Sequence, residues 1–109
     1  MARAGYKWIT YAQSLGLRGP AQSTAVVLAS YADDQGVAWP SVATLMLGSG
    51  YSRSATQSGL RILEQLGIIE VERGVGRGNG NRYHLTLKVP SDEQIAALGV
   101  AWRPGPTVP

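Results

Sequence analysis

The sequence predicts an α+β domain that is mainly α-helical with one small β-hairpin. Apolar residues recur at helical spacing, between capping residues, over residues 19–66. Two short runs of alternating apolar and polar residues flank the glycine-rich residues 74–80. The chain has 109 residues, of which 44% are hydrophobic and 16% are charged. This length and composition are those of one globular domain with a single modest core.

The first helix of this domain is predicted to begin at Gly19-Pro20, because proline is favoured at the first helical position. Four apolar residues then follow at helical spacing: Ala25, Leu28, Ala29 and Ala32. The Asp-Asp-Gln-Gly sequence of residues 33–36 ends the run. Residues 37–39 are long enough for only a very short strand.

A second, short helix is predicted after Pro40, with Ser41 as its N-cap. The Gly-Ser-Gly sequence of residues 48–50 ends it. Its inward residues are predicted to be Val42, Leu45 and Met46. This helix has no acidic or basic residue, so we expect that one apolar side chain, such as that of Leu47, is left exposed.

Ser52 is predicted to cap a third helix, which ends at Gly67 in a left-handed backbone conformation. The spacing assigns one face of this helix to the core: Thr56, Gly59, Leu60 and Leu63, with Leu66 beyond them. The opposite face then carries hydrogen-bonding side chains: Arg53, Ser54, Gln57, Ser58 and Arg61.

The two alternating runs, residues 69–72 and 82–87, predict a hairpin with a long glycine-rich loop. Symmetric pairing about the loop places apolar residues opposite apolar ones and acids opposite bases. The predicted pairs are Val71 with Tyr83, Ile69 with Leu85, Glu72 with Arg82, and Glu70 with His84. His84 is therefore expected to form a surface pair with Glu70, and Leu87 to extend the second strand.

The predicted domain proper covers residues 18–88, with additions at both ends. Residues 1–17 form an N-terminal extension that is predicted to be helical, from the spacing of Trp8, Tyr11, Ala12 and Leu15. Within residues 89–102, the Ser-Asp-Glu-Gln sequence 91–94 resembles a capping box and predicts a short helix. Residues 103–109 contain three prolines and are predicted to be a flexible tail.

The predicted order is helix, short strand, helix, tight turn, helix, strand, glycine-rich loop and strand, which is the order of a winged helix-turn-helix. The matching segments are residues 32–41, Thr44-Leu45, residues 50–54 and residues 60–69. Over about residues 18–87 the sequence resembles the winged helix-turn-helix domains that are common in bacterial, plasmid and phage regulators and replication initiators. In that group, Trp-Pro-Ser leads into the second helix, and Leu-Gly-Ile-Ile joins the recognition helix to the wing.

This arrangement predicts contacts with double-stranded DNA. Gln57 and Arg61 are one helical turn apart on the third helix, so both can reach a major groove, where Gln can pair with adenine and Arg with guanine. Ser52, Arg53, Ser54 and Ser58 lie on or beside the same face. If the predicted core face is rotated by one position, Ser54 and Ser58 take the reading positions.

Further contacts with the DNA backbone are predicted around this helix. Arg77 at the tip of the wing is the best single candidate, since neighbouring glycines let it approach phosphates or the minor groove. Asn79 is expected to contact the DNA beside Arg77. Arg73, at the strand end, and Arg82 are further candidates, although Arg82 is also expected to pair with Glu72. Ser41 and Thr44 lie where such folds commonly touch phosphate, although capping alone explains Ser41.

Nothing in the sequence favours an enzyme, a metal site or a cofactor site. The single histidine, His84, has no partner with catalytic or ligand spacing, and Asp33-Asp34 fits turn chemistry. The glycine-rich run lacks the Gly-Lys-Ser/Thr ending of a phosphate loop. The absence of cysteine excludes disulfides, Cys-bound zinc and a thiol nucleophile.

The charge distribution supports a nucleic-acid partner, because the net charge is +3 and residues 51–88 alone carry six basic and three acidic residues. We therefore expect a sequence-specific DNA-binding protein, most simply a transcriptional regulator that acts as a homodimer on half-sites. An origin-binding replication or partition protein is the alternative with the same chemistry. A second alternative is a protein-interaction module that uses Leu47, Ile62, Tyr6, Trp8 and Tyr11.

The expected location is the cytoplasm, associated with the nucleoid. The longest charge-free stretch, residues 35–52, contains Pro40 and several Gly, Ser and Thr residues, so it does not suit a membrane span. Residues 1–7 lack the apolar run of a signal peptide. Neither a membrane nor a small-molecule substrate is expected as a partner.

Overall fold

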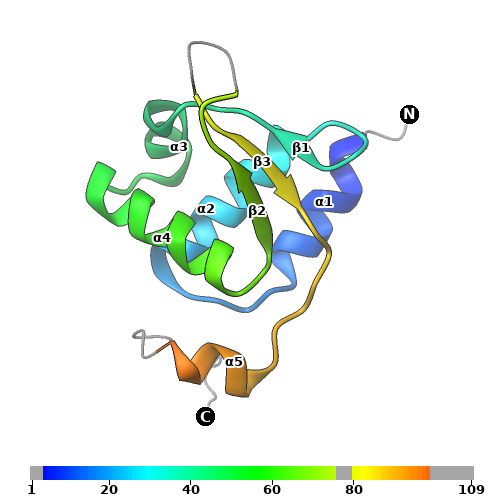
Figure 1. Cartoon of the computed structure of the whole chain (residues 1–109), viewed down its shortest axis with the longest axis vertical. Coiled ribbons are helices and arrows are strands. Elements are labelled where there is room, and N and C mark those ends of the chain that lie inside the picture. Colours follow the sequence, from blue (N-terminus) through cyan, green and yellow to red (C-terminus); the bar gives the residue numbers. More distant parts are fainter. Residues whose placement is uncertain (1–3, 76–79, 99–109) are drawn as a thin grey trace.

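A computed structural model of the chain describes residues 4–75 and 80–98, over which five helices and three strands follow one another (Figure 1). Their order is α1 (Ala4–Gln13), α2 (Gly19–Ser30), β1 (Val37–Ala38), α3 (Val42–Ser49), α4 (Arg53–Gln65), β2 (Ile69–Glu72), β3 (Arg82–Leu85) and α5 (Asp92–Ala97). This is the predicted mainly helical class with a small antiparallel sheet, and the order from α2 to β3 is that of a winged helix-turn-helix.

The core lies between the helices and one face of the sheet. Helix α2 packs against both α1 and α4, and α3 packs against α2 and α4. The largest fully buried side chains come from four different elements and from the turn before β2: Leu28, Leu45, Leu63, Ile68, Ile69, Thr24 and Thr56. Burying this apolar surface is the main favourable term for the fold.

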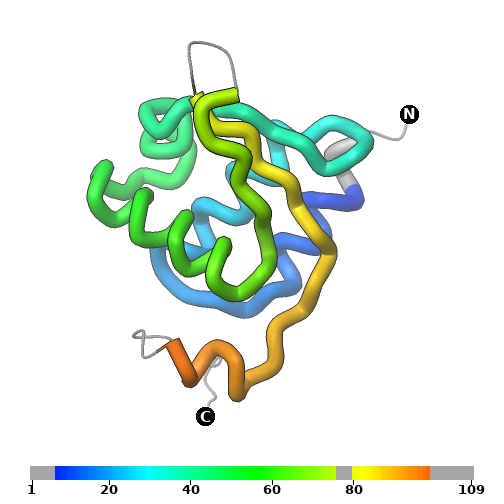
Figure 2. The backbone as a smooth tube through the Cα atoms, viewed as in Figure 1, coloured from blue at the N-terminus to red at the C-terminus, as the bar shows by residue number. Residues whose placement is uncertain are grey.

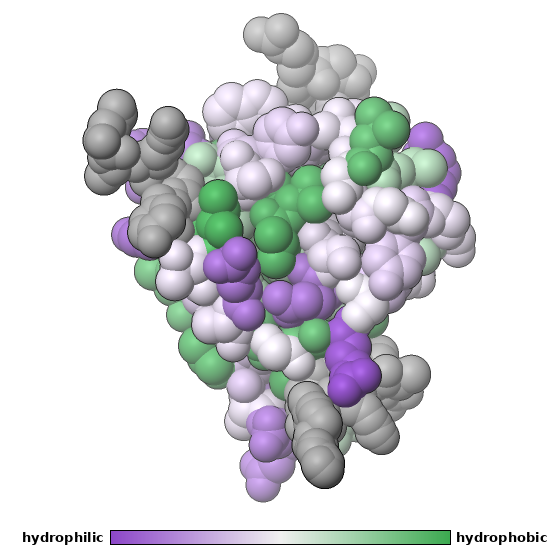
Figure 3. Space-filling model, turned by 180° about the vertical axis from the view of Figure 1, so that it is seen from behind, coloured by the Kyte–Doolittle hydropathy of each residue, from purple (hydrophilic) through white to green (hydrophobic). Residues whose placement is uncertain are grey.

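Helix α1 is part of the same core. Its residues Trp8, Tyr11 and Ala12 are buried, as is Leu15 just after it. The expectation that Trp8 and Tyr11 could form an exposed protein-contact surface is therefore wrong. Figure 3 shows the molecule from behind, the side of α1 and α2, and there hydrophobic and hydrophilic residues are interspersed.

The helix ends agree with the predicted capping residues. Pro20 occupies the first turn of α2. The Ser41 hydroxyl accepts a hydrogen bond from the Thr44 amide at 3.0 Å, and the Ser52 hydroxyl accepts one from the Ala55 amide at 3.1 Å. Gly50 and Gly67 both have left-handed backbone conformations, each with φ of 78°. These local signals place α3 and α4 at the predicted positions.

The three strands form one antiparallel sheet in the order β1-β3-β2. The predicted hairpin register is confirmed at all four positions, with Ile69 opposite Leu85, Glu70 opposite His84, Val71 opposite Tyr83 and Glu72 opposite Arg82. Strand β1 pairs with the other edge of β3.

The second strand of the hairpin is shorter than predicted. Leu87 lies outside β3, is exposed, and has a positive φ of 66°. This left-handed conformation turns the chain out of the sheet, so the alternation of Tyr83, Leu85 and Leu87 does not continue as strand. The extension of the strand to Leu87 was therefore wrong.

After β3 the chain runs along the body to α5, at the opposite end of the molecule from α3 (Figure 2). The Tyr11 hydroxyl donates a hydrogen bond to the Lys88 carbonyl oxygen. Ser91 and Gln94 form the predicted capping box of α5, and Ile95 is buried. Within the described residues, no helix is both long and apolar enough to cross a membrane.

Candidate nucleic-acid interface

Helix α4 turns one face to the core and the other to solvent, as its spacing predicts. Thr56, Gly59 and Leu63 are buried, whereas Gln57 and Arg61 are exposed. Arg53 and Ser54 are also exposed, while Leu60, Ile62 and Ser58 are half-buried. The hydrogen-bonding face of α4 is therefore available to a partner.

A groove separates this face of α4 from the hairpin. Two neighbouring hollows of about 260 and 390 Å³ form it, and they share three lining residues: Val42, Asn81 and Tyr83. The remaining polar lining brings together five residues that the sequence analysis proposed for DNA contact: Ser41, Arg53, Gln57, Arg61 and Arg73. We call this surface the α4–wing groove. Its residues come from α3, α4 and the hairpin, so only the folded chain assembles it.

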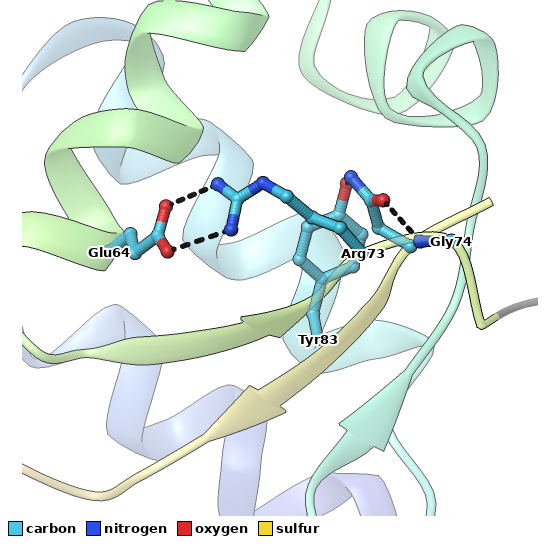
Figure 4. A network of polar contacts seen from close by, with 5 residues as sticks. Glu64, Arg73, Gly74 and Tyr83 are labelled. Atoms are coloured by element: carbon cyan, nitrogen blue, oxygen red, sulfur yellow. Dashed lines mark hydrogen bonds and ion pairs between the residues drawn. The ribbon is translucent and has the colours of Figure 1, made fainter.

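The arginines of the α4–wing groove differ in what they contact. Within the described part of the chain, neither Arg53 nor Arg61 forms an ion pair, although the Arg61 guanidinium donates a hydrogen bond to the Ser58 hydroxyl at 3.0 Å. Arg73 instead binds both carboxylate oxygens of Glu64, at 2.8 and 3.2 Å (Figure 4). The hydrogen bonds from Arg73 lower the pKa of the Glu64 carboxyl.

Asn81 holds the base of the hairpin at the edge of the groove. Its side-chain oxygen accepts from the Gly74 amide at 3.4 Å, and its side-chain nitrogen donates to the Tyr83 hydroxyl, also at 3.4 Å. Asn81 was not among the residues predicted to contact DNA. An asparagine at the end of a glycine-rich loop is a signal for such a turn contact and could have identified it.

Arg82 lies on the other face of the sheet. Tyr83 lines the groove, and Arg82, its neighbour along β3, lines a different hollow with His84, Trp39 and Asp33. Side chains alternate along a strand, so Arg82 cannot join Arg61 and Arg73. The fold separates Arg82 from the α4–wing groove.

The partner of His84 also differs from the expected one. Glu70 is opposite His84 in the ladder, but the imidazole Nε2 is 2.6 Å from the Glu72 carboxylate, which Arg82 also binds at 3.2 Å. The expected His84–Glu70 pair is therefore wrong, because the diagonal neighbour is within reach of the ring. The pKa of Glu72 is lowered, first by the hydrogen bond with His84 and then by the charges of Arg82 and His84.

The hydroxyl residues proposed for backbone contact already have structural roles. Ser41 and Ser52 cap α3 and α4, and the Ser41 and Thr44 hydroxyls are 3.0 Å apart and hydrogen-bonded. Ser41 and Ser52 are nevertheless exposed, and a hydroxyl has one donor and two acceptor positions, so capping alone does not use up their hydrogen-bonding capacity. Arg77 and Asn79, the two candidates at the tip of the wing, lie outside the described residues.

Comparison with known families agrees with this arrangement. Residues 25–69 match the family model described as "Helix-turn-helix domain", a segment that runs from within α2 through α3 and α4 to the first residue of β2. No curated protein and no solved structure matches the sequence. Residues 25–69 therefore match a helix-turn-helix domain, and together with the β2–β3 hairpin they have the element order of a winged helix.

Proposed function

We propose that this protein binds double-stranded DNA with sequence preference, with α4 in the major groove and the wing on the adjacent backbone. The observation that carries the proposal is the α4–wing groove, where Arg53, Gln57 and Arg61 of α4 line the same surface as the base of the hairpin. An α-helix fits a major groove, and Arg and Gln are the side chains that read guanine and adenine. In this proposal Ser41 and Thr44 add backbone contacts, while Ser52, Ser54 and Ser58 lie on or beside the reading face of α4.

The wing supplies the remaining contacts in this proposal. Arg77 and Asn79 are proposed as wing contacts from the sequence alone. Arg82 is a weaker candidate, since it binds Glu72 on the face of the sheet that lies away from α4. The binding unit is residues 18–88, and α1 and α5 complete its core.

We further propose that the protein is a transcriptional regulator and binds as a homodimer on half-sites about 10 base pairs apart. The buried face of α1 is not available as a dimer interface, because Trp8 and Tyr11 are used within the chain. An origin-binding replication or partition protein would use the same residues. The position of the preferred sites, upstream of genes or within an origin, distinguishes these two roles.

Binding to duplex DNA of random sequence at several salt concentrations tests the basic proposal. The expected result is a linear fall of log K with log salt, with a slope of about −0.9 for each phosphate contacted. Arg53→Gln should flatten this slope by about one phosphate. Lys88→Gln removes one positive charge from the segment that leads to α5 and serves as the matched control.

Two outcomes would contradict DNA binding through the α4–wing groove. One is the absence of any salt-dependent binding to duplexes by the unmodified chain. The other is an Arg53→Gln effect that does not exceed the Lys88→Gln effect, because the contact surface would then lie elsewhere. If duplexes are bound, selection of bound fragments from genomic DNA identifies the preferred sequence and its position.

A further inference from the structure

Glu64 lines the α4–wing groove and forms an ion pair with Arg73 there. It lies in the last turn of α4, and its two carboxylate oxygens accept hydrogen bonds from two nitrogens of the Arg73 guanidinium. A guanidinium binds a phosphate in the same two-pronged geometry. Glu64 therefore fills the site on Arg73 that a phosphate would use.

Residues 51–88 contain three acidic residues, and Glu64 is the one that lies between α4 and the hairpin. The other two are Glu70 and Glu72. Glu72 binds Arg82 and His84 on the far face of the sheet, and Glu70 follows the same alternation. Of these three acids, Glu64 is therefore the one that lines the α4–wing groove with Gln57 and Arg61.

We propose that Glu64 competes with DNA phosphate for Arg73 and so weakens the binding of any duplex. The inference rests on the proposed function. Phosphate contacts carry no sequence information, so the competition lowers the affinity for preferred and random duplexes by a similar factor. Glu64 limits how long the protein is held on DNA that lacks its preferred sequence.

The exposure of the pair favours competition over a purely structural role. The Arg73 and Glu64 side chains are 62% and 34% exposed, so a phosphate can reach the guanidinium. Exposed ion pairs contribute little to stability. The hairpin is already held by pairing of β3 on both edges and by the Asn81 contacts, so the Glu64–Arg73 pair is not needed to place it.

The Glu64→Gln variant tests the proposal. Its affinity for a duplex of random sequence is measured by fluorescence anisotropy. We expect about two- to fivefold tighter binding, the factor that corresponds to release of an exposed ion pair. The salt slope should steepen by up to about 0.9, because Arg73 becomes free to contact one more phosphate. Glu70→Gln removes the same charge from the other face of the sheet and measures the general effect of net charge.

The double variant Glu64→Gln, Arg73→Gln isolates the effect of the Glu64–Arg73 ion pair on DNA affinity. In the Arg73→Gln background, Glu64→Gln should change the affinity no more than Glu70→Gln does, since no guanidinium remains to be released. A Glu64→Gln effect equal to that of Glu70→Gln in the unmodified background would overturn the proposal. Weaker binding by Glu64→Gln would also overturn it and would show that the pair positions the wing.

The failures of the two proposals are distinguishable. If the unmodified chain binds no duplex, the proposed function itself fails. If the unmodified chain binds duplexes and Glu64→Gln behaves as Glu70→Gln, only the inference about Glu64 fails. Circular dichroism melting of each variant shows whether a change in affinity reflects a change in folding, and we expect melting temperatures close to that of the unmodified chain.

Discussion

Gly59 of α4 lies so close to Pro20 of α2 that a Cβ atom at position 59 would be 2.9 Å from the Pro20 carbonyl oxygen. The same Cβ atom would be 3.2 Å from the Ala21 amide nitrogen. Both neighbours are backbone atoms, so neither can turn aside as a side chain can. The absence of a side chain at position 59 therefore sets the distance between the proposed recognition helix and the helix that supports it.

Gly59→Ala is expected to destabilise the fold by roughly 1–3 kcal/mol, because the added methyl group forces α4 away from α2. This cost opposes a gain of about 1 kcal/mol from the better helix propensity of alanine. Urea unfolding measures the net change. Gly48→Ala is the matched control in α3, where the new Cβ would be 2.8 Å from a side-chain carbon of Val27. The branched Val27 side chain is stiff but still yields more readily than the backbone of α2, so a larger cost at position 48 than at position 59 would contradict the argument.

Gly67→Val is expected to cost about 1 kcal/mol or more, because Gly67 has a φ of 78° that a branched side chain rarely adopts. The neighbouring atom, Lys88 Cδ, would be 3.3 Å from a Cβ and belongs to an exposed side chain, so the cost comes from the backbone. Gly67→Asn should cost less, since asparagine tolerates the left-handed region. Equal losses of thermal stability for the Val and Asn variants would mean that backbone conformation is not the cause.

Gln57→Ala and Arg61→Ala should each weaken binding to a preferred duplex by about 1–3 kcal/mol, with a much smaller effect on random DNA. Both side chains are exposed on α4 and line the α4–wing groove, so they are placed to contact base edges. Competition binding with preferred and random duplexes measures the ratio of the two affinities. Because specificity is this ratio, it should fall in both variants.

Gln13→Ala provides the control for Gln57→Ala. Gln13 is an exposed residue at the end of α1, so the same side chain is removed from a helix that does not line the groove. It should leave both affinities unchanged. Full discrimination between preferred and random duplexes by both the Gln57 and Arg61 variants would refute base reading by these two residues.

The stability of the hairpin should fall in acid. The pKa of Glu72 is lowered from its ordinary value of 4.5, first by the His84 hydrogen bond and then by the Arg82 and His84 charges. A lowered pKa stabilises the fold above pH 4.5, and this stabilisation is lost as the pH falls through the pKa of the folded state. Glu64, whose pKa Arg73 lowers, contributes in the same direction.

Glu72→Gln should therefore flatten the fall in melting temperature between about pH 6 and about pH 3. The control is Glu70→Gln, which removes a carboxylate that forms no ion pair within the described part of the chain. A steep acid transition that is unchanged in the Glu72 variant would show that other carboxylates dominate it.

Local signals predicted most of the fold. The helix ends depend on nearby residues, since α3 and α4 begin at the caps Ser41 and Ser52 and α4 ends at Gly67. The hairpin register follows from the two alternating runs on either side of one loop. Leu87 was assigned incorrectly because alternation alone does not reveal a left-handed residue. The backbone there turns toward α5, and Pro90, three residues further on, is the nearest sequence signal that the strand ends.

The site was less predictable than the fold. Helical spacing identified the exposed face of α4, because that face depends on one helix alone. The Glu64–Arg73 pair joins residues on different elements, so the sequence showed the charges but not the pairing. The face occupied by Arg82 could have been inferred from its neighbour Tyr83, which was already assigned to the apolar side of the hairpin.

In the strand order β1-β3-β2, β3 of the hairpin also pairs with β1, which joins the hairpin to the rest of the domain. To rotate the base of the hairpin away from α4 would break backbone hydrogen bonds along both edges of β3. A duplex that docks against α4 and the base of the hairpin would meet a stiff surface, so any mismatch in shape would be taken up by the DNA. The stiffness of the duplex, which varies with base sequence, would then contribute to selectivity at base pairs that no side chain touches.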